Sequence, residues 1–215
     1  MFSYLKPNYV TIARRRHFSF AGQIYPSVSK ILTATKPERD RQALQRWRKR
    51  VGYQQAQKIS TAACQRGTSL HTAIKYYLEG KPLPEDVEDN VFWHSITPVL
   101  TEVSKVHLVE SAVYHQECRY AGVVDCLGEW ESDLCVFDWK TASKPKKIEW
   151  ITDYCLQVTA YTAAIASLYN VNVDRAIIAI ALSDREAQTF HLNSEELNDY
   201  WQQFNERLRL YQSLP

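Results

Sequence analysis

The distribution of apolar residues changes near the middle of this 215-residue chain. Up to about residue 105 the pattern is mainly helical, with one short alternating hairpin at 17–26. Ser27 or Ser29 can cap the first of these helices. Thr68 or Ser69 can cap the fourth, which is expected to end near residue 80. The pattern therefore predicts helices at 27–32, 37–52, 53–64, 68–80 and 86–105.

Strand patterns dominate the second half of the chain. Three successive segments rich in β-branched and aromatic residues are expected to form a meander. A later run is apolar throughout, as in a strand that is covered on both faces. Ser194, followed by Glu195 and Glu196, begins a closing amphipathic helix. The expected strands are 106–114, 120–130, 134–141, 175–182 and 187–192, with a helix at 149–169. This order predicts an α/β fold with a mixed central sheet flanked by helices.

The composition is that of an ordinary globular protein, with 45% hydrophobic and 23% charged residues. The formal net charge of +2 hides a strong asymmetry. Residues 1–60 carry 13 basic and two acidic side chains, an excess of +11, whereas residues 61–215 carry 13 basic and 22 acidic ones, an excess of −9. Aromatic residues lie among the N-terminal charges, so this segment is expected either to bind a single nucleic-acid strand or to form solvated helix faces. We expect a basic, mainly helical lobe at 1–65 and a core at 66–215.

The five cysteines are odd in number and form no CxxC pair. They are expected to be small apolar residues of a reducing compartment rather than disulfides or a zinc site. No apolar stretch approaches the length that spans a bilayer, and the N-terminus lacks the apolar core of a secretory signal. The sequence therefore predicts an intracellular protein without a membrane partner, and nothing in it indicates an obligate protein partner, so a monomer is expected.

Asp125, Asp138 and Lys140 are the chemically most informative residues. They lie on two predicted neighbouring strands joined by a polar turn, so the two carboxylates are expected to lie across from each other. Because side chains alternate along a strand, Asp138 and Lys140 point to one face and Trp139 to the other. Carboxylate oxygens suit Mg²⁺, and the lysine can orient the attacking water or offset charge in phosphodiester hydrolysis. The alternative is a surface hairpin with a cross-strand salt bridge. Glu110, on the preceding strand, can join the metal shell or form a cross-strand pair.

Four short motifs resemble those of PD-(D/E)XK nucleases of the RecB-like branch. Gly122-x-x-Asp125 is similar to the second motif, Asp138-Trp-Lys140 to the third, and Gln157-x-x-x-Tyr161 to the QxxxY motif on the next helix. Arg66-Gly-Thr-x-x-His71 is similar to the upstream helix motif. The residues that carry the resemblance are Arg66, His71, Gly122, Asp125, Asp138, Lys140, Gln157 and Tyr161.

The resemblance implies an active site around one or two divalent ions, with Mg²⁺ the expected cofactor and Mn²⁺ a substitute. It implies that Asp125, Asp138, His71 and the Trp139 carbonyl bind the metal. The catalytic residues are then Asp125, Asp138, Lys140 and His71. The residues expected to contact the substrate are Gln157, Tyr161, Thr68, Ser69, Thr141, Ser143 and Lys144. The last three follow the catalytic strand, where an ordinary exposed loop is an equally good interpretation.

A closer resemblance is to the mitochondrial genome maintenance exonuclease type. Pro26-Ser-Val-Ser29-Lys-Ile-Leu32 is similar to its N-terminal Pro-Ser-Val-Thr segment, with Ser29 in place of threonine. This resemblance implies hydrolysis of single-stranded DNA from an end, by a bacterial, phage or mitochondrial protein. No cysteine follows Cys155, so we expect no iron–sulphur cluster of the kind held by C-terminal cysteines. A structure-selective endonuclease and a non-catalytic DNA-binding module of the same fold are the alternatives.

Overall fold

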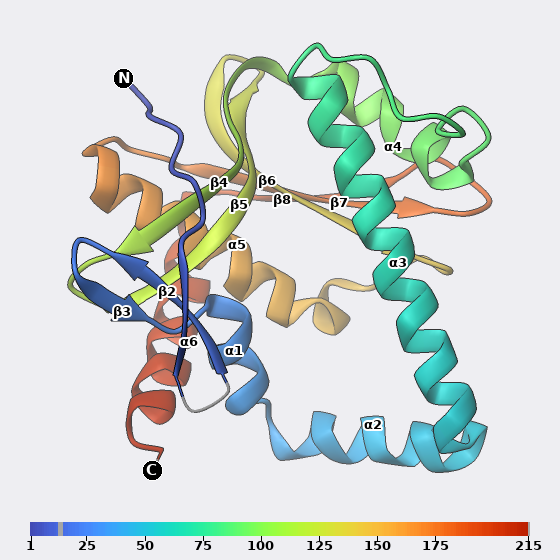
Figure 1. Ribbon diagram of the computed structural model, residues 1–215, viewed down its shortest axis with the longest axis horizontal. Helices are drawn as coiled ribbons and strands as arrows, with labels where there is room; N and C mark the ends of the chain where they lie inside the picture. The colour runs from blue at the N-terminus through green and yellow to red at the C-terminus, as the bar shows by residue number, and fades with distance from the viewer. Residues whose placement is uncertain (13–14, 215) are drawn as a thin grey trace.

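A five-stranded mixed sheet forms the centre of the part of the chain that the structure describes (Figure 1). The structure is a computed structural model and describes residues 1–12 and 15–214. The strands lie in chain order, β4-β5-β6-β7-β8, and all neighbours are antiparallel except β6 and β7, which are parallel. The strands of this sheet are β4 (Ser104–His115), β5 (Tyr120–Trp130), β6 (Asp133–Ala142), β7 (Arg175–Leu182) and β8 (Gln188–Leu192). The predicted α/β fold is therefore confirmed.

Helices cover both faces of this sheet. The helices are α1 (Val28–Ala34), α2 (Glu38–Val51), α3 (Tyr53–Leu78), α4 (Val91–Thr101), α5 (Thr152–Tyr169) and α6 (Ser194–Gln212), with a short 3-10 turn, η1 (Ile148–Trp150). Apolar residues of α1, α5 and α6 pack on one face, and those of α3 and α4 pack on the other. Strand β7 contributes alternate residues to each of the two cores, which explains why it is apolar from Ala176 to Leu182.

A small antiparallel sheet precedes these elements and packs against β5 in a separate apolar cluster. It contains β1 (Tyr9–Ile12), β2 (Arg15–Phe20) and β3 (Gln23–Tyr25), so the expected hairpin at 17–26 is present. Phe18 and Tyr25 are buried against Ala121 of β5. The Ala121 N–H donates a hydrogen bond to the Pro26 carbonyl, with 3.0 Å between the two atoms. This contact fixes the start of α1, where the Ser27 hydroxyl accepts a hydrogen bond from the Lys30 N–H as a cap.

Two of the expected helix boundaries are wrong. The segments predicted as 53–64 and 68–80 form one continuous helix, α3, so Thr68 and Ser69 lie inside a helix and do not cap one. Thr68 instead donates its hydroxyl to the Cys64 carbonyl one turn earlier. Gly67 is tolerated because it has ordinary helical geometry and no neighbouring atom within 4 Å of an added Cβ. The expected boundary between residues 65 and 66 also lies within α3.

One other helix begins at a residue that the sequence pattern did not indicate. Helix α4 begins at Val91, after a turn, because the Asn90 side chain caps it by accepting from the Phe92 N–H. The strand pattern takes over at Ser104, so this helix is shorter than the expected 86–105. Helix α6 begins at Ser194, as expected, and its cap is the preceding residue, Asn193, which forms a reciprocal capping box with Glu196.

Candidate metal centre

Strands β5 and β6 bring the two predicted carboxylates together. Their register pairs Cys126 with Phe137, which places Asp125 beside Asp138 on the adjacent strand. The Trp139 N–H donates a hydrogen bond to Asp125 Oδ2, with 2.8 Å between the atoms. Asp138 is fully buried and Asp125 almost so. The surface salt-bridge alternative is therefore excluded by burial, because neither carboxylate is on a solvated hairpin.

Side chains alternate along β6 between the two faces of the sheet. Trp139 points to the α3–α4 side, where it stacks on Phe137 with 5.3 Å between ring centroids. Lys140 lies on the α5 side, with its ammonium 5.2 Å from the centre of the Tyr154 ring. It forms an ion pair with Asp138 Oδ2. This alternation leaves the Asp138 carboxylate, the Lys140 ammonium and the Trp139 backbone carbonyl near one another. The Trp139 indole packs in the core on the α3–α4 side.

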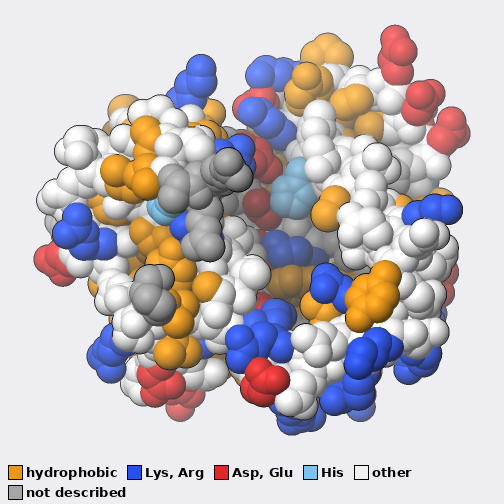
Figure 2. All heavy atoms as spheres, turned by 60° about the horizontal axis from the view of Figure 1, so that its bottom comes forward, with side chains coloured by type: hydrophobic (Ala, Val, Ile, Leu, Met, Phe, Trp, Pro, Cys, Tyr) orange, Lys and Arg blue, Asp and Glu red, His pale blue; other side chains and the backbone are white. Residues whose placement is uncertain are grey.

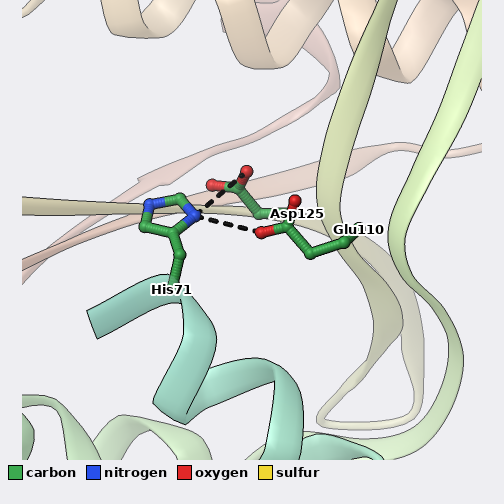
Figure 3. A group of neighbouring side chains, drawn as sticks. All are labelled: His71, Glu110 and Asp125. Atoms are coloured by element: carbon green, nitrogen blue, oxygen red, sulfur yellow. Dashed lines mark hydrogen bonds and ion pairs between the residues drawn. The ribbon is translucent and has the colours of Figure 1, made fainter. Parts of the chain in front are cut away.

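His71 projects from α3 toward two carboxylates on the sheet (Figure 3). Its Nδ1 lies 3.1 Å from Glu110 Oε1 and 3.7 Å from Asp125 Oδ1. Its Nε2 donates to the Trp139 carbonyl at 2.9 Å. One ligand atom from each of His71, Glu110 and Asp125 lies within 4.8 Å of the others, a spacing at which a single cation can be shared.

The backbone of β4 is distorted at Glu110 to allow this approach. The register pairs Val109 with Cys126 and Ser111 with Val124, so Glu110 lies opposite Asp125. Glu110 has a φ of 47°, in the left-handed region that non-glycine residues rarely adopt. Strain of this kind is usually retained at functional positions. Glu110 is thus held beside Asp125 by the local geometry, and it contacts His71 rather than a basic residue of the opposite strand.

The Asp138 carboxylate is chemically incomplete. Among the described residues, neither of its oxygens has a hydrogen-bond partner of good geometry, and Lys140 is its only ion-pair partner. A buried carboxylate in this state is costly unless a further cation compensates it. Hard carboxylate oxygens, a carbonyl and an imidazole form a donor set that suits a divalent ion. His71, Glu110 and Asp125 could therefore hold a metal. The two further predicted ligands adjoin them, since Asp138 lies beside Asp125 and the Trp139 carbonyl contacts His71.

Burial and charge shift the pKa values of these groups. Burial raises the pKa of Asp138 to about 6, although Lys140 opposes the shift. Burial also raises the pKa of Asp125 against the charges of His71 and Lys140. Burial alone would lower the pKa of His71, but the hydrogen bond to Glu110 and the charge of Asp125 outweigh it and raise the pKa to about 9. Burial would likewise lower the pKa of Lys140, but Asp138 and Asp125 hold it above its ordinary value. Without a metal, both cationic side chains are therefore charged at neutral pH.

Gln157 and Tyr161 share one face of α5, as their spacing predicts, and meet each other. Gln157 Nε2 donates to the Tyr161 hydroxyl at 3.1 Å. Burial, followed by the charges of Asp125 and Asp138, raises the pKa of Tyr161, so this phenol stays protonated beside the carboxylates. Gly122 faces the same ring. A Cβ at Gly122 would lie 2.3 Å from Tyr161 Cε1, so glycine is required for this packing.

Five further residues are expected substrate contacts, namely Thr68, Ser69, Thr141, Ser143 and Lys144. Thr68 lies with His71 and Glu110 in a groove of about 570 Å³. Thr141 accepts a hydrogen bond from Arg66 Nε at 3.2 Å, which joins the end of β6 to α3. Ser69, Ser143 and Lys144 are exposed, the last two in the loop after β6.

The molecular surface is deeply hollowed at this position. Figure 2 shows a hollow between two halves of the molecule, with histidine and acidic side chains on its walls and Lys and Arg side chains on its floor and lower rim. An acidic centre within a basic surround is the arrangement expected of a site that holds a cation and receives a phosphate.

Proteins of similar sequence are named exonucleases. The chain is 33% identical over 218 residues to mitochondrial genome maintenance exonuclease 1 of Xenopus tropicalis, covering 95% of this chain and 62% of that protein. The Mus musculus and Homo sapiens proteins of the same name are 34% and 30% identical, over 86% and 87% of this chain and 58% of each relative. This chain is a relative of these exonucleases. It spans less than two thirds of their length. No protein-family model matches it.

The mixed sheet and its flanking helices fit the PD-(D/E)XK-like core that the sequence resemblance implied. Among solved structures, a candidate exonuclease of Eubacterium rectale has 10% sequence identity and a TM-score of 0.47, over 68% of this chain and 66% of that one. Among the described residues, no helix combines the length and apolar composition needed to cross a membrane.

Two residues that contact the site, and one exposed tryptophan outside it, were not indicated as functional by the sequence. Tyr154 lies under the Lys140 ammonium, and its position one turn before Gln157 on α5 could have indicated it. Arg66 contacts Thr141 and was noted only as a motif residue. Trp150 is 66% exposed at the end of the loop after β6, and no sequence signal distinguishes it from a core tryptophan.

Proposed function

We propose that this protein is a metal-dependent nuclease that degrades single-stranded DNA from an end. The observation that carries the proposal is the buried, incompletely compensated Asp138 beside Asp125, Lys140 and His71. The relationship to proteins named exonucleases supports hydrolysis of phosphodiester bonds. We further propose Mg²⁺ as the cofactor, with Mn²⁺ as a substitute, because hard oxygen ligands predominate in the donor set.

Each catalytic side chain has a proposed task in this reaction. A divalent ion bound here would lower the pKa of a water ligand and stabilise charge on the phosphate. The Trp139 N–H holds Asp125 by one oxygen and leaves the other free to bind. Lys140, kept charged by Asp138, orients the attacking water and offsets charge that develops on the phosphate. His71 is aligned by its hydrogen bond to the Trp139 carbonyl. The protonated Tyr161 and Gln157 position the strand.

Single-strand preference is supported by the exposed elements around the site. Helix α2 buries none of its residues, and its last turn carries Arg48, Lys49 and Arg50. Gly52 connects α2 to α3, and the two helices meet at a corner (Figure 1). Helix α3 is the helix that carries His71. Trp150 offers a solvent-exposed ring for stacking on an unpaired base. We infer that the protein acts as a monomer, in an intracellular compartment that suits its five free cysteines.

The function can be tested with end-labelled linear and circular single strands of one sequence. We expect linear DNA to be degraded with Mg²⁺ or Mn²⁺ but not with a chelator, and circular DNA to remain intact. Cleavage of the circle would instead indicate the endonuclease alternative. Asp138→Asn and Lys140→Ala should abolish cleavage while DNA binding persists. Cleavage retained by either purified variant would refute the assigned roles, and binding by a wild type that never cleaves would favour the non-catalytic module.

A further inference from the structure

Two adjoining cavities lie beside the small N-terminal sheet, and the smaller one separates it from β5 of the core sheet. The smaller has a volume of about 210 Å³ and extends from Tyr9 and Phe18 to Tyr161. The larger, of about 870 Å³, lies between α1 and the end of α6. Arg16, Ser27 and Ser29 line both cavities, so the two are parts of one groove. Tyr161 and Gly122 therefore line the inner end of this groove, which is separate from the groove that contains His71 and Glu110.

The cations in this groove are not compensated by carboxylates. Neither Arg16 nor Lys30 forms an ion pair among the described residues, and none of the described residues that line the two cavities is acidic. The Lys30 ammonium contacts His17 Nε2 at 2.7 Å, and because an ammonium can only donate, the imidazole nitrogen accepts. The Arg16 guanidinium lies 4.2 Å from the centre of the Tyr9 ring. By contrast, Lys36, which follows α1, is paired with Asp153.

Two hydroxyl groups complete the polar lining. Ser27 Oγ lies 3.1 Å from Ser29 Oγ, and it accepts the Lys30 N–H at 3.1 Å. Ser29 is exposed. Positive side chains with neighbouring hydroxyl donors and no carboxylate form a lining that suits a phosphate oxygen better than a neutral ligand.

The groove also has the right position for a phosphate of the substrate. Gly122 precedes Asp125 by three residues on β5, which corresponds to about 10 Å of strand. Tyr161 connects the groove to the metal centre. Its ring borders the smaller cavity and packs on Gly122, and its hydroxyl is close enough to Asp125 and Asp138 for their charges to raise its pKa. We propose that Arg16, Lys30, Ser27 and Ser29 form a phosphate-binding subsite that holds the DNA strand beside the metal centre. This inference rests on the proposed function for the identity of the ligand.

The subsite can be tested by binding alone, in chelator, where no cleavage occurs. Affinity for a fluorescent single strand is measured by anisotropy over a range of salt concentrations. Each lost phosphate contact should reduce the slope of log K against log salt by about 0.7. We expect Lys30→Gln and Arg16→Gln each to show this reduction and Lys30→Arg to keep the wild-type slope. Lys81→Gln and Arg185→Gln are matched controls, because both cations are paired locally with Glu79 and Asp184. Unchanged slopes in both groove variants would overturn the proposal.

Strands with different ends show whether the subsite binds a terminal phosphate or an internal phosphodiester. Strands with a 5′-phosphate, a 3′-phosphate or neither are compared with the wild type and Lys30→Gln. An effect confined to one phosphorylated strand supports binding of that end, and an equal effect on all three supports binding of an internal phosphodiester. Circular dichroism confirms that each variant is folded. If the wild type binds with the expected slopes but never cleaves, the nuclease proposal fails and the subsite stands. If the wild type cleaves but the slopes do not change, only the subsite fails.

Discussion

Gly122 permits a close approach of Tyr161 on α5 to the sheet, and replacing it should disturb the site in a defined way. In Gly122→Ala the new Cβ would lie 2.3 Å from Tyr161 Cε1 and 3.0 Å from Tyr161 Cζ and the hydroxyl oxygen. Ordinary carbon–carbon contacts are about 3.5–4.0 Å, so the ring must move by more than about 1 Å. The backbone of Gly122 is not in the left-handed region, so the effect is purely steric.

The cost follows from the surroundings of Tyr161. Its side chain is buried, so it cannot turn into solvent without exposing the core and losing the Gln157 hydrogen bond. Overpacking a closely packed site by one methyl group costs about 1–3 kcal/mol. For a domain of this size, each kcal/mol lowers the melting temperature by about 2–4 °C. Movement of the phenol should also reduce kcat, because small displacements of positioning groups are costly in catalysis.

Urea denaturation and thermal unfolding in chelator measure the stability change without a metal contribution. The matched control is Gly67→Ala on α3, where an added Cβ meets nothing within 4 Å. That variant should be more stable by about 0.5–1 kcal/mol, because alanine is the better helix former. The reasoning is refuted if Gly122→Ala unfolds at the wild-type urea concentration, or if both glycine variants change stability in the same direction.

Three further predictions test other parts of the structure. In chelator, the pKa of His71 is raised to about 9 in the folded protein. His71 therefore binds its proton more tightly in the folded protein than in the unfolded chain, and protonation stabilises the fold. This contribution to the unfolding free energy is complete below pH 6.5 and is lost as the pH rises to 9, a change of about 3 kcal/mol. Urea denaturation of His71→Asn should show no such change between these two pH values. Trp150→Ala should weaken single-strand binding, measured by anisotropy, by about 1–3 kcal/mol with little change in stability. The control is Tyr4→Ala, which also removes an exposed ring and should leave binding unchanged. Arg207→Lys should lower the unfolding free energy by about 1.5–3 kcal/mol in urea, because Arg207 joins the Leu32 carbonyl and Thr35 to Asp153.

The strands were predictable because their sequence patterns match how they are buried. The run at 176–182 is apolar at every position, and the structure places alternate residues in two different cores. The continuity of α3 was not predictable from local signals. Gly67-Thr68-Ser69 has the composition of a helix boundary, but burial of Leu70, Ala73 and Ile74 against the sheet extends the helix through it.

The candidate site was predictable to the extent that its residues lie in short motifs. Asp125, Asp138 and Lys140 lie on two strands linked by a tight turn, so alternation alone brings them together. The approach of His71 to Glu110 depends on how α3 packs on β4 and on the left-handed backbone of Glu110, and neither is encoded by a local pattern. The subsite at Arg16 and Lys30 likewise joins a hairpin and a helix whose contact is tertiary.

The charges at the centre explain why a metal and a basic surround belong together. Asp125, Asp138 and Glu110 contribute three negative charges, while Lys140 and a protonated His71 contribute two positive ones. This cluster alone is net negative and would repel a phosphate. A divalent ion that displaces the His71 proton brings the sum to zero and adds a ligand for phosphate oxygen. We propose that the N-terminal excess of +11 supplies the long-range attraction for a strand that a neutral centre lacks. The strand should therefore still bind in chelator, through the basic surround, but without the contact that places the scissile phosphate at Lys140.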